Sequence, residues 1–157
     1  MNAKMSELKN CFEKAGFTDV KTVLGSGNVL FSARTSSEAT LERQIEKTMK
    51  THLDRVFQTI VRPVDAIQEI LASDPFEAFR LKSASKRIVT FLRAKPSVKI
   101  KLPVVLEGAR ILKVEGREIY TTYVPSPKGP VFMTLIEKTF GKEVTTRTWE
   151  TLKKLVR

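Results

Sequence analysis

The sequence predicts an α+β protein of two tandem ferredoxin-like (βαββαβ) units, each with an extra helix, in which the first unit lacks its first strand. The second half of the chain shows the pattern strand, helical piece, strand, strand, helix, strand, helix. The first half shows the same order without the opening strand. Glycine-bearing turns join a strand pair in each half, and 157 residues with 41% hydrophobic content can form two small cores.

The first half is expected to contain two helices around a β-hairpin, followed by a strand and a short helix. The hairpin is the clearest signal, because two β-rich runs flank the polar turn Gly25-Ser26-Gly27-Asn28. The expected elements are a helix with the stripe Met5, Leu8, Phe12 and Ala15 that ends at Gly16, strands over 19–24 and 28–33, a helix from a capping box at 35–38 to about 53, a strand over 56–61, and a short helix carrying Ile67, Ile70 and Leu71.

The second half follows a chain break at Asp74-Pro75-Phe76. We expect domains over 1–73 and 87–157 with a linker over 74–86. Pro103 interrupts residues 96–106, which predicts a short, poorly formed helix or turn there. The other expected elements are a strand over 88–92, a hairpin of strands 110–114 and 119–124, a helix from Pro130 with the stripe Phe132, Leu135, Ile136 and Phe140, a strand over 144–147, and a final helix that Thr148 caps and that packs through Trp149, Leu152 and Val156.

In a ferredoxin-like sheet the first strand is central, so a unit without it would leave unpaired backbone groups. Three explanations stay open for the first half. The chain could begin downstream of the true start, another chain could donate the strand, or the first sheet could be rearranged. The second explanation would make the protein a homodimer through its incomplete first sheet.

Composition restricts the function classes. The net charge of +11 predicts a partner that is nucleic acid or an anionic small molecule, unless the basic surface serves only solubility. No apolar run approaches the roughly 18 residues of a membrane span, so no membrane partner is expected. The single Cys11 fits a reducing, cytoplasmic location and is expected in the core. One Cys and one His, His52, cannot form a closed zinc site, so no metal and no cofactor are predicted.

Two polar stretches are candidate ligand sites. Ser26 and Asn28 could present donors to a ligand, or could simply form a turn that needs small residues. Thr145-Thr-Arg-Thr-Trp149 precedes a helix whose N–H groups and dipole favour an anion. The alternative is that Thr148 caps the helix, Trp149 anchors the core and the arginine pairs with an acid. The candidate ligand-binding residues are Ser26, Asn28, Tyr120, Tyr123, Thr146 and Arg147.

A dense basic set lies in and after the expected linker. Strand-borne aromatic residues such as Phe91 near these cations would suit single-stranded RNA, because bases stack on rings while cations hold phosphates. A solvated face is the alternative. The basic residues are Arg80, Lys82, Lys86, Arg87, Arg93, Lys95, Lys99 and Lys101.

Four motifs together resemble a known family. They are Ala15-Gly-Phe-Thr-Asp-Val20, Ser26-Gly-Asn-Val-Leu-Phe31, Gly116-Arg-Glu-Ile-Tyr120 and the run from Thr145 through Trp149 to Leu155. The chain resembles the bacterial family called domain of unknown function 1697. The resemblance implies a soluble cytoplasmic protein with tandem ferredoxin-like units, and it brings no assigned reaction.

The chain departs from the family pattern at its start and at several polar positions. The family normally opens with an apolar strand and an Arg-Gly-Ile-Asn-Val-Gly-Gly-like loop, and this chain begins just after that loop. Family members usually carry Gln where this chain has Gly25, and Asn where it has Thr148. If these positions form a site in the family, the resemblance implies that the site is altered here.

The sequence therefore favours a non-catalytic binding domain for an anionic ligand, either nucleic acid or a phosphorylated small molecule. No catalytic residues are predicted, because Ser26 has no nearby His and no triad is visible. One alternative is an enzyme whose site needs the missing N-terminal segment. The other is an assembly protein that dimerises through an open sheet.

Overall fold

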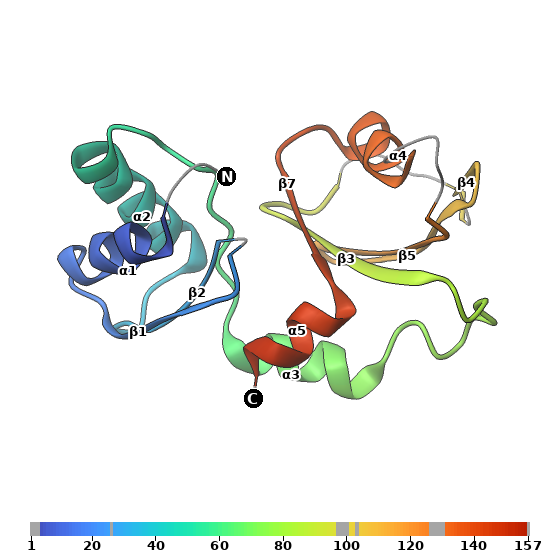
Figure 1. Cartoon of the computed structure of the whole chain (residues 1–157), viewed down its shortest axis with the longest axis horizontal. Helices are drawn as coiled ribbons and strands as arrows, with labels where there is room; N and C mark the ends of the chain where they lie inside the picture. The colour runs from blue at the N-terminus through green and yellow to red at the C-terminus, as the bar shows by residue number, and fades with distance from the viewer. Residues whose placement is uncertain (1–3, 26, 97–100, 103, 126–130, 157) are drawn as a thin grey trace. The chain divides into compact units, whose positions relative to one another are not determined.

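The protein is a mixed α+β structure, which the computed structural model describes for residues 4–25, 27–96, 101–102, 104–125 and 131–156 (Figure 1). The described residues form five helices and two antiparallel sheets. The chain divides into two compact units, Met1–Pro63 and Val64–Val156. This division precedes the segment 74–86 that the sequence suggested as a linker, because Phe76 is buried against residues of the second unit.

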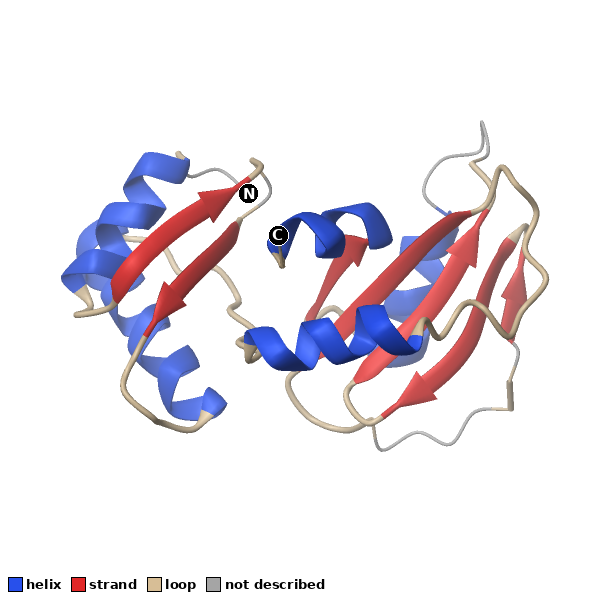
Figure 2. Cartoon of the chain, turned by 90° about the horizontal axis from the view of Figure 1, so that it is seen from below, coloured by secondary structure: helices blue, strands red, loops and turns tan. Residues whose placement is uncertain are grey.

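The first unit is built from α1 (Met5–Lys14), β1 (Thr18–Val23), β2 (Asn28–Ser32) and α2 (Glu38–Leu53). The predicted hairpin is confirmed, since β1 and β2 pair antiparallel with Val23 opposite Asn28. Both helices pack on the hairpin (Figure 2). Their contact is a core of seven buried residues, which are Leu8, Cys11, Phe12, Phe17, Val20, Ile45 and Met49.

The end of α1 follows directly from the sequence. Gly16 has φ +96°, and its N–H donates to the carbonyl of Glu13, while the N–H of Phe17 donates to the carbonyl of Phe12. This is a Schellman motif, which satisfies carbonyls that the helix leaves unpaired. The rings of Phe12 and Phe17 pack with centroids 6.0 Å apart, so the motif also supplies a core contact.

The strand expected over 56–61 is wrong, because this segment pairs with no strand among the described residues. Its backbone bonds to α2 instead. The N–H of Thr59 donates to Glu46 Oε2 at 3.1 Å, and the N–H of Val61 donates to Glu42 Oε2 at 2.8 Å. The two carboxylates therefore take the place of strand carbonyls as acceptors.

The second unit contains a five-stranded sheet in the order β4-β5-β6-β3-β7, with all neighbours antiparallel. The expectation of a helix or turn over 96–106 is wrong for its last three residues, which form a short edge strand; residues 97–100 and 103 lie outside the described part. The elements are α3 (Val64–Ser73), β3 (Lys86–Leu92), β4 (Val104–Leu106), β5 (Ala109–Glu115), β6 (Glu118–Tyr123), α4 (Val131–Phe140), β7 (Val144–Thr148) and α5 (Trp149–Leu155).

Helices cover both faces of this sheet (Figure 2). On one face, Leu135 and Ile136 of α4 pack over Leu92, Ile111 and Ile119. On the other face lie α3, α5 and the turn after α3. There the ring of Phe76 meets the rings of Tyr120 and Trp149 edge-on, at centroid distances of 5.8 and 5.3 Å. The turn at 74–79 is thus part of the second core.

Candidate anion-binding site

The hairpin candidate in the first unit serves structure. Asn28 is buried, and its Nδ2 donates to the carbonyl of Val23 at 3.1 Å, which ties the two strands together at the turn. Ser26 lies outside the described residues. In the described part of the turn, the candidate ligand-binding group is the Asn28 amide, and this amide is already bonded to the backbone.

The four candidates in the second unit lie on opposite faces of the sheet. Tyr120 and Arg147 both pair with Val89, so their side chains share the face that α5 covers. Tyr123 stacks on Phe132 of α4, with centroids 4.4 Å apart, and therefore lies on the opposite face. The structure thus does not gather the candidate residues into one site.

Tyr120 lies in the core with 3% of its surface exposed. Burial raises the pKa of its phenol, and the negative charges of Glu118 and Glu115 raise it further. The side chain therefore remains a neutral phenol, and its ring packs against Phe76.

Arg147 and Thr148 form hydrogen bonds within the second unit. Arg147 Nη1 donates to the carbonyl of Thr146 at 2.7 Å, and desolvation lowers the pKa of the guanidinium. Thr148 Oγ1 accepts the N–H of Thr151 at 3.2 Å and so caps α5, while Trp149 is buried. Two parts of the alternative for this stretch, the Thr148 cap and the buried Trp149, are thus confirmed.

Thr146 lies on the α4 face, where its hydroxyl donates to the sulfur of Met133 at 3.8 Å. Tyr123 on the same face is occupied by its stack on Phe132. These two candidates therefore contact α4.

The expected basic set separates into groups at the two ends of β3. Arg80 and Lys82 precede the strand, Lys86 and Arg87 begin it, and Arg93 and Lys95 follow its end; Lys101 precedes β4, and Lys99 lies outside the described residues. A seven-residue strand spans roughly 23 Å. One compact ligand cannot contact both groups.

The structure adds a basic site that the sequence did not indicate. Thr122 of β6 pairs with Arg87 of β3 on one side and with Arg110 of β5 on the other. Directly opposed residues of an antiparallel sheet point to the same face. We call Arg87, Thr122 and Arg110 the arginine row.

The geometry of the arginine row suits an anion. The two arginine backbones are two strand spacings apart, roughly 9.5–10 Å, and the residue between them is small. The hydroxyl of Thr122 donates to the carbonyl of Lys86 at 2.9 Å, so it is held down on the sheet. Among the described residues, neither guanidinium forms an ion pair or a hydrogen bond. Both are therefore available to a ligand.

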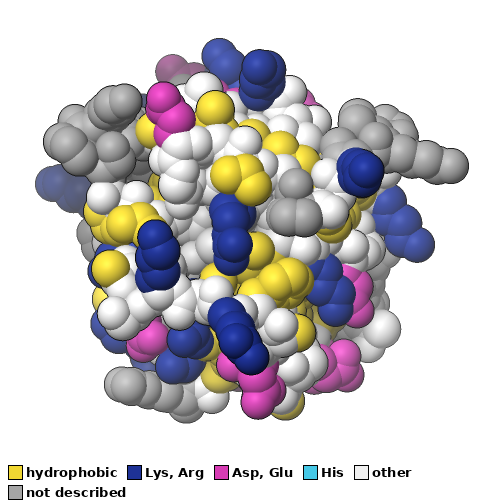
Figure 3. Space-filling view, turned by 90° about the vertical axis from the view of Figure 1, so that its right-hand side faces the viewer, with side chains coloured by type: hydrophobic (Ala, Val, Ile, Leu, Met, Phe, Trp, Pro, Cys, Tyr) yellow, Lys and Arg dark blue, Asp and Glu magenta, His cyan; other side chains and the backbone are white. Residues whose placement is uncertain are grey.

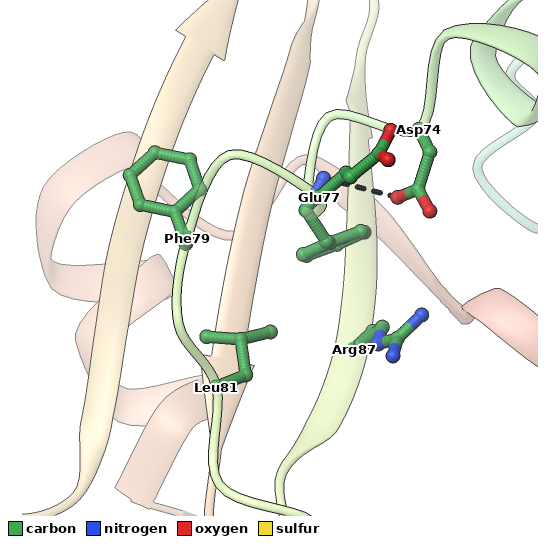
Figure 4. Close-up of a pocket in the computed structure, with 6 residues that line it drawn as sticks. Asp74, Glu77, Phe79, Leu81 and Arg87 are labelled. Carbon is green, nitrogen blue, oxygen red and sulfur yellow. Dashed lines mark hydrogen bonds between the residues drawn. The ribbon is translucent and has the colours of Figure 1, made fainter.

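A cavity of about 270 Å³ adjoins the arginine row (Figure 4). Arg87 lines it, and so do residues of the segment that leads from α3 into β3. Phe79 and Leu81 form one wall, and the carboxyl groups of Asp74 and Glu77 lie together at one end (Figure 4). Asp74 Oδ1 accepts the N–H of Phe76 at 3.2 Å, which holds the turn in place.

The surface of the second unit mixes cations with apolar side chains. Figure 3 shows Lys and Arg side chains scattered over one face, with hydrophobic side chains between them. Val105 of the edge strand β4 is 59% exposed and pairs with Arg110, which extends the arginine row by one apolar residue. In the described part of the chain, no three metal-ligating side chains come together, and no helix is long and apolar enough to cross a membrane.

Sequence reasoning missed Arg110 and Thr122 because their importance depends on strand register. The alternation in 109–115 could have placed Arg110 on the face opposite to Ile111. It could not have shown that Arg87, more than twenty residues earlier, lies two strands away on that same face.

Comparison with known proteins identifies the family. The family model described as "Protein of unknown function (DUF1697)" matches residues 1–120. None of the curated proteins matches the chain. The solved structure of the conserved bacterial protein SP0830 from Streptococcus pneumoniae is similar, with a TM-score of 0.65 and 18% identity over 99% of this chain and 88% of that one. At that identity the likeness concerns the fold alone. Since the family model covers most of the sequence, the chain belongs to the DUF1697 family.

Proposed function

We propose that the chain is a non-catalytic binding domain and that the arginine row binds a phosphoryl group of an anionic ligand. The observation that carries this proposal is the placement of Arg87 and Arg110 on either side of Thr122, with no ion pair to either guanidinium among the described residues. The ligand is a phosphorylated small molecule or nucleic acid.

Arginine suits this role because its planar fork of N–H donors matches the oxygens of a phosphate. Two such forks, two strands apart, can donate to one phosphoryl group from both sides. The net charge of +11 supports the proposal, since a positive field raises the local concentration of anions.

Titration calorimetry with pyrophosphate at low salt tests the site. Arg87→Gln and Arg110→Gln each remove a charged donor, and a hydrogen bond to a charged group is worth about 1.5–3 kcal/mol, so each should weaken binding about 10- to 100-fold. Lys95→Gln removes one exposed charge at the other end of β3 and should change the affinity less than about twofold.

The same titration separates the arginine row from the site expected at β7. If Arg147→Ala weakens pyrophosphate binding while Arg87→Gln and Arg110→Gln do not, the arginine row is not the site. Equal affinities in the wild type and both row variants would also refute the proposal. The dependence of affinity on salt distinguishes the two ligand classes. A nucleic acid binder loses affinity steeply as the salt concentration rises, because the release of counterions into a more concentrated solution gains less free energy.

We propose homodimerisation through the first sheet as a second candidate function. In the part of the chain that the structure describes, that sheet has two strands, and the segment at 59–61 bonds to α2 rather than to β2. An edge strand with unpaired backbone groups can pair with its copy across a twofold axis. Light scattering coupled to size exclusion should then give a dimer, and Leu30→Lys on β2 should dissociate it. A monomeric wild type contradicts this candidate.

We also infer that the second unit is a ferredoxin-like sheet and that the protein acts in the cytoplasm. The order β5-β6-β3-β7 with antiparallel neighbours is the order that a βαββαβ unit produces, which supports the first inference. The single, buried Cys11 supports the second. An intermediate-resolution experimental structure tests the first, and fractionation of the producing cells tests the second.

A further inference from the structure

We propose that the cavity beside Arg87 binds the guanine base of a guanosine nucleotide whose phosphate lies on the arginine row. This inference rests on the proposed function and names its ligand. Arg87 belongs both to the arginine row and to the lining of the cavity, so a phosphate and the group attached to it would meet the two features together.

One side of the cavity suits the face of a flat aromatic ring. Phe76 is a buried residue of the lining. Phe79 and Leu81 are partly exposed along one side (Figure 4). Aromatic side chains provide faces on which nucleobases stack. A cavity of about 270 Å³ limits the ligand to a group the size of a single base with part of its sugar.

The acidic end of the cavity selects among the bases. Asp74 Oδ1 is already engaged by the N–H of Phe76. The carboxylate of Glu77 is exposed, and among the described residues it has no hydrogen-bond or ion-pair partner. Both of its oxygens can therefore accept hydrogen bonds from a ligand.

Guanine is the base that matches this acceptor pair. Its N1–H and exocyclic N2–H are adjacent donors, so one carboxylate can accept both. Adenine and cytosine each place a ring acceptor next to their amino group, and that acceptor would face the second carboxylate oxygen. Uracil offers one donor between two acceptors. Glu77 therefore favours guanine over the other three bases.

A free mononucleotide fits better than a nucleic acid strand. The volume of the cavity matches one base, and the arginine row beside it provides two cations for one phosphoryl group. Arg93 and Lys95 of the expected basic set lie at the opposite end of β3, so these two cations do not continue a track for a strand from this cavity, whereas Arg80, Lys82 and Lys86 lie at the same end as Arg87.

Titration calorimetry with GMP, IMP and pyrophosphate tests this inference. IMP differs from GMP by the loss of the exocyclic amine, so the wild type should bind GMP about tenfold more tightly than IMP. Glu77→Gln should remove this preference, because the amide supplies one acceptor in place of two, and should leave pyrophosphate binding unchanged. Glu69→Gln, an exposed acid on α3 outside the cavity, should change neither.

The outcomes separate this inference from the proposed function. If pyrophosphate does not bind, the proposed function fails. If pyrophosphate binds at the arginine row but the wild type binds GMP no more tightly than IMP, the guanine site is refuted and the proposed function stands. If a guanine-containing hexaribonucleotide binds more than about tenfold more tightly than GMP at 150 mM salt, the ligand is a nucleic acid and the mononucleotide is excluded.

Discussion

Truncation of Phe76 to alanine should destabilise the second unit severely. Phe76 is 2% exposed, and its ring meets both Tyr120 and Trp149 edge-on. Deleting a buried phenylalanine ring costs about 3–5 kcal/mol, since the transfer energy is lost and a cavity remains. The two aromatic pairs place the expected cost at the upper end of that range.

This cost is a large part of the total stability of the unit. Roughly 90 residues correspond to about 5–13 kcal/mol of unfolding free energy. With a urea m value of about 1.5 kcal/mol/M, a loss of about 5 kcal/mol lowers the midpoint by roughly 3 M. Trp149 is the sole tryptophan in the sequence, so its fluorescence reports the unfolding of this unit.

Phe79→Ala provides the matched control, because Phe79 belongs to the same turn but is partly exposed. Its midpoint should fall by well under half as much as that of Phe76→Ala. If Phe76→Ala unfolds at the same urea concentration as the wild type, the turn at 74–79 does not form part of the second core.

Three further predictions concern single residues. Gly16→Ala should destabilise the first unit by about 1 kcal/mol in urea denaturation monitored by circular dichroism, because φ is +96° at Gly16. No atom lies within contact of an added Cβ at either Gly16 or Gly25, but Gly25 has no positive φ, so the control Gly25→Ala should be neutral or stabilising. Thr148→Ala should cost about 1 kcal/mol through loss of the cap on the Thr151 N–H, seen as a lower midpoint of Trp149 fluorescence, and an unchanged midpoint would show that the cap is unimportant. Burial raises the pKa of the Cys11 thiol, and the charge of Lys14 opposes this shift. The contribution of the thiol to the free energy of unfolding should therefore be complete below its unfolded pKa of about 8.5 and should fall as pH rises towards its folded pKa. Rapid reaction of the native protein with a disulfide reagent at pH 8 would contradict the burial of Cys11.

The sequence determined the local elements of this protein. The β-rich runs around Gly25–Asn28 predicted the hairpin, and the apolar stripe from Met5 with Gly16 after it predicted α1 and its end. These features depend on residues only a few positions apart, so periodicity and turn chemistry suffice to read them. The capping role of Thr148 and the burial of Trp149 could be read for the same reason.

Long-range contacts decided what the sequence left open or suggested wrongly. Residues 56–61 have the composition of a strand. In the structure, however, the N–H groups of Val61 and Thr59 donate to the carboxylates of α2. No sequence pattern predicts hydrogen bonds between these distant residues. The candidate ligand residues near β6 and β7 alternate between two buried faces, so closeness in the sequence did not make them neighbours in space.

The arginine row depends on tertiary structure in the same way. Alternation along a strand tells which residues share a face, and it leaves open which strand lies alongside and in what register. Only the order β5-β6-β3 and its register bring Arg110 and Arg87 to either side of Thr122. The sequence thus supplied the charges, whereas the pairing of strands distant in the chain decided where those charges meet.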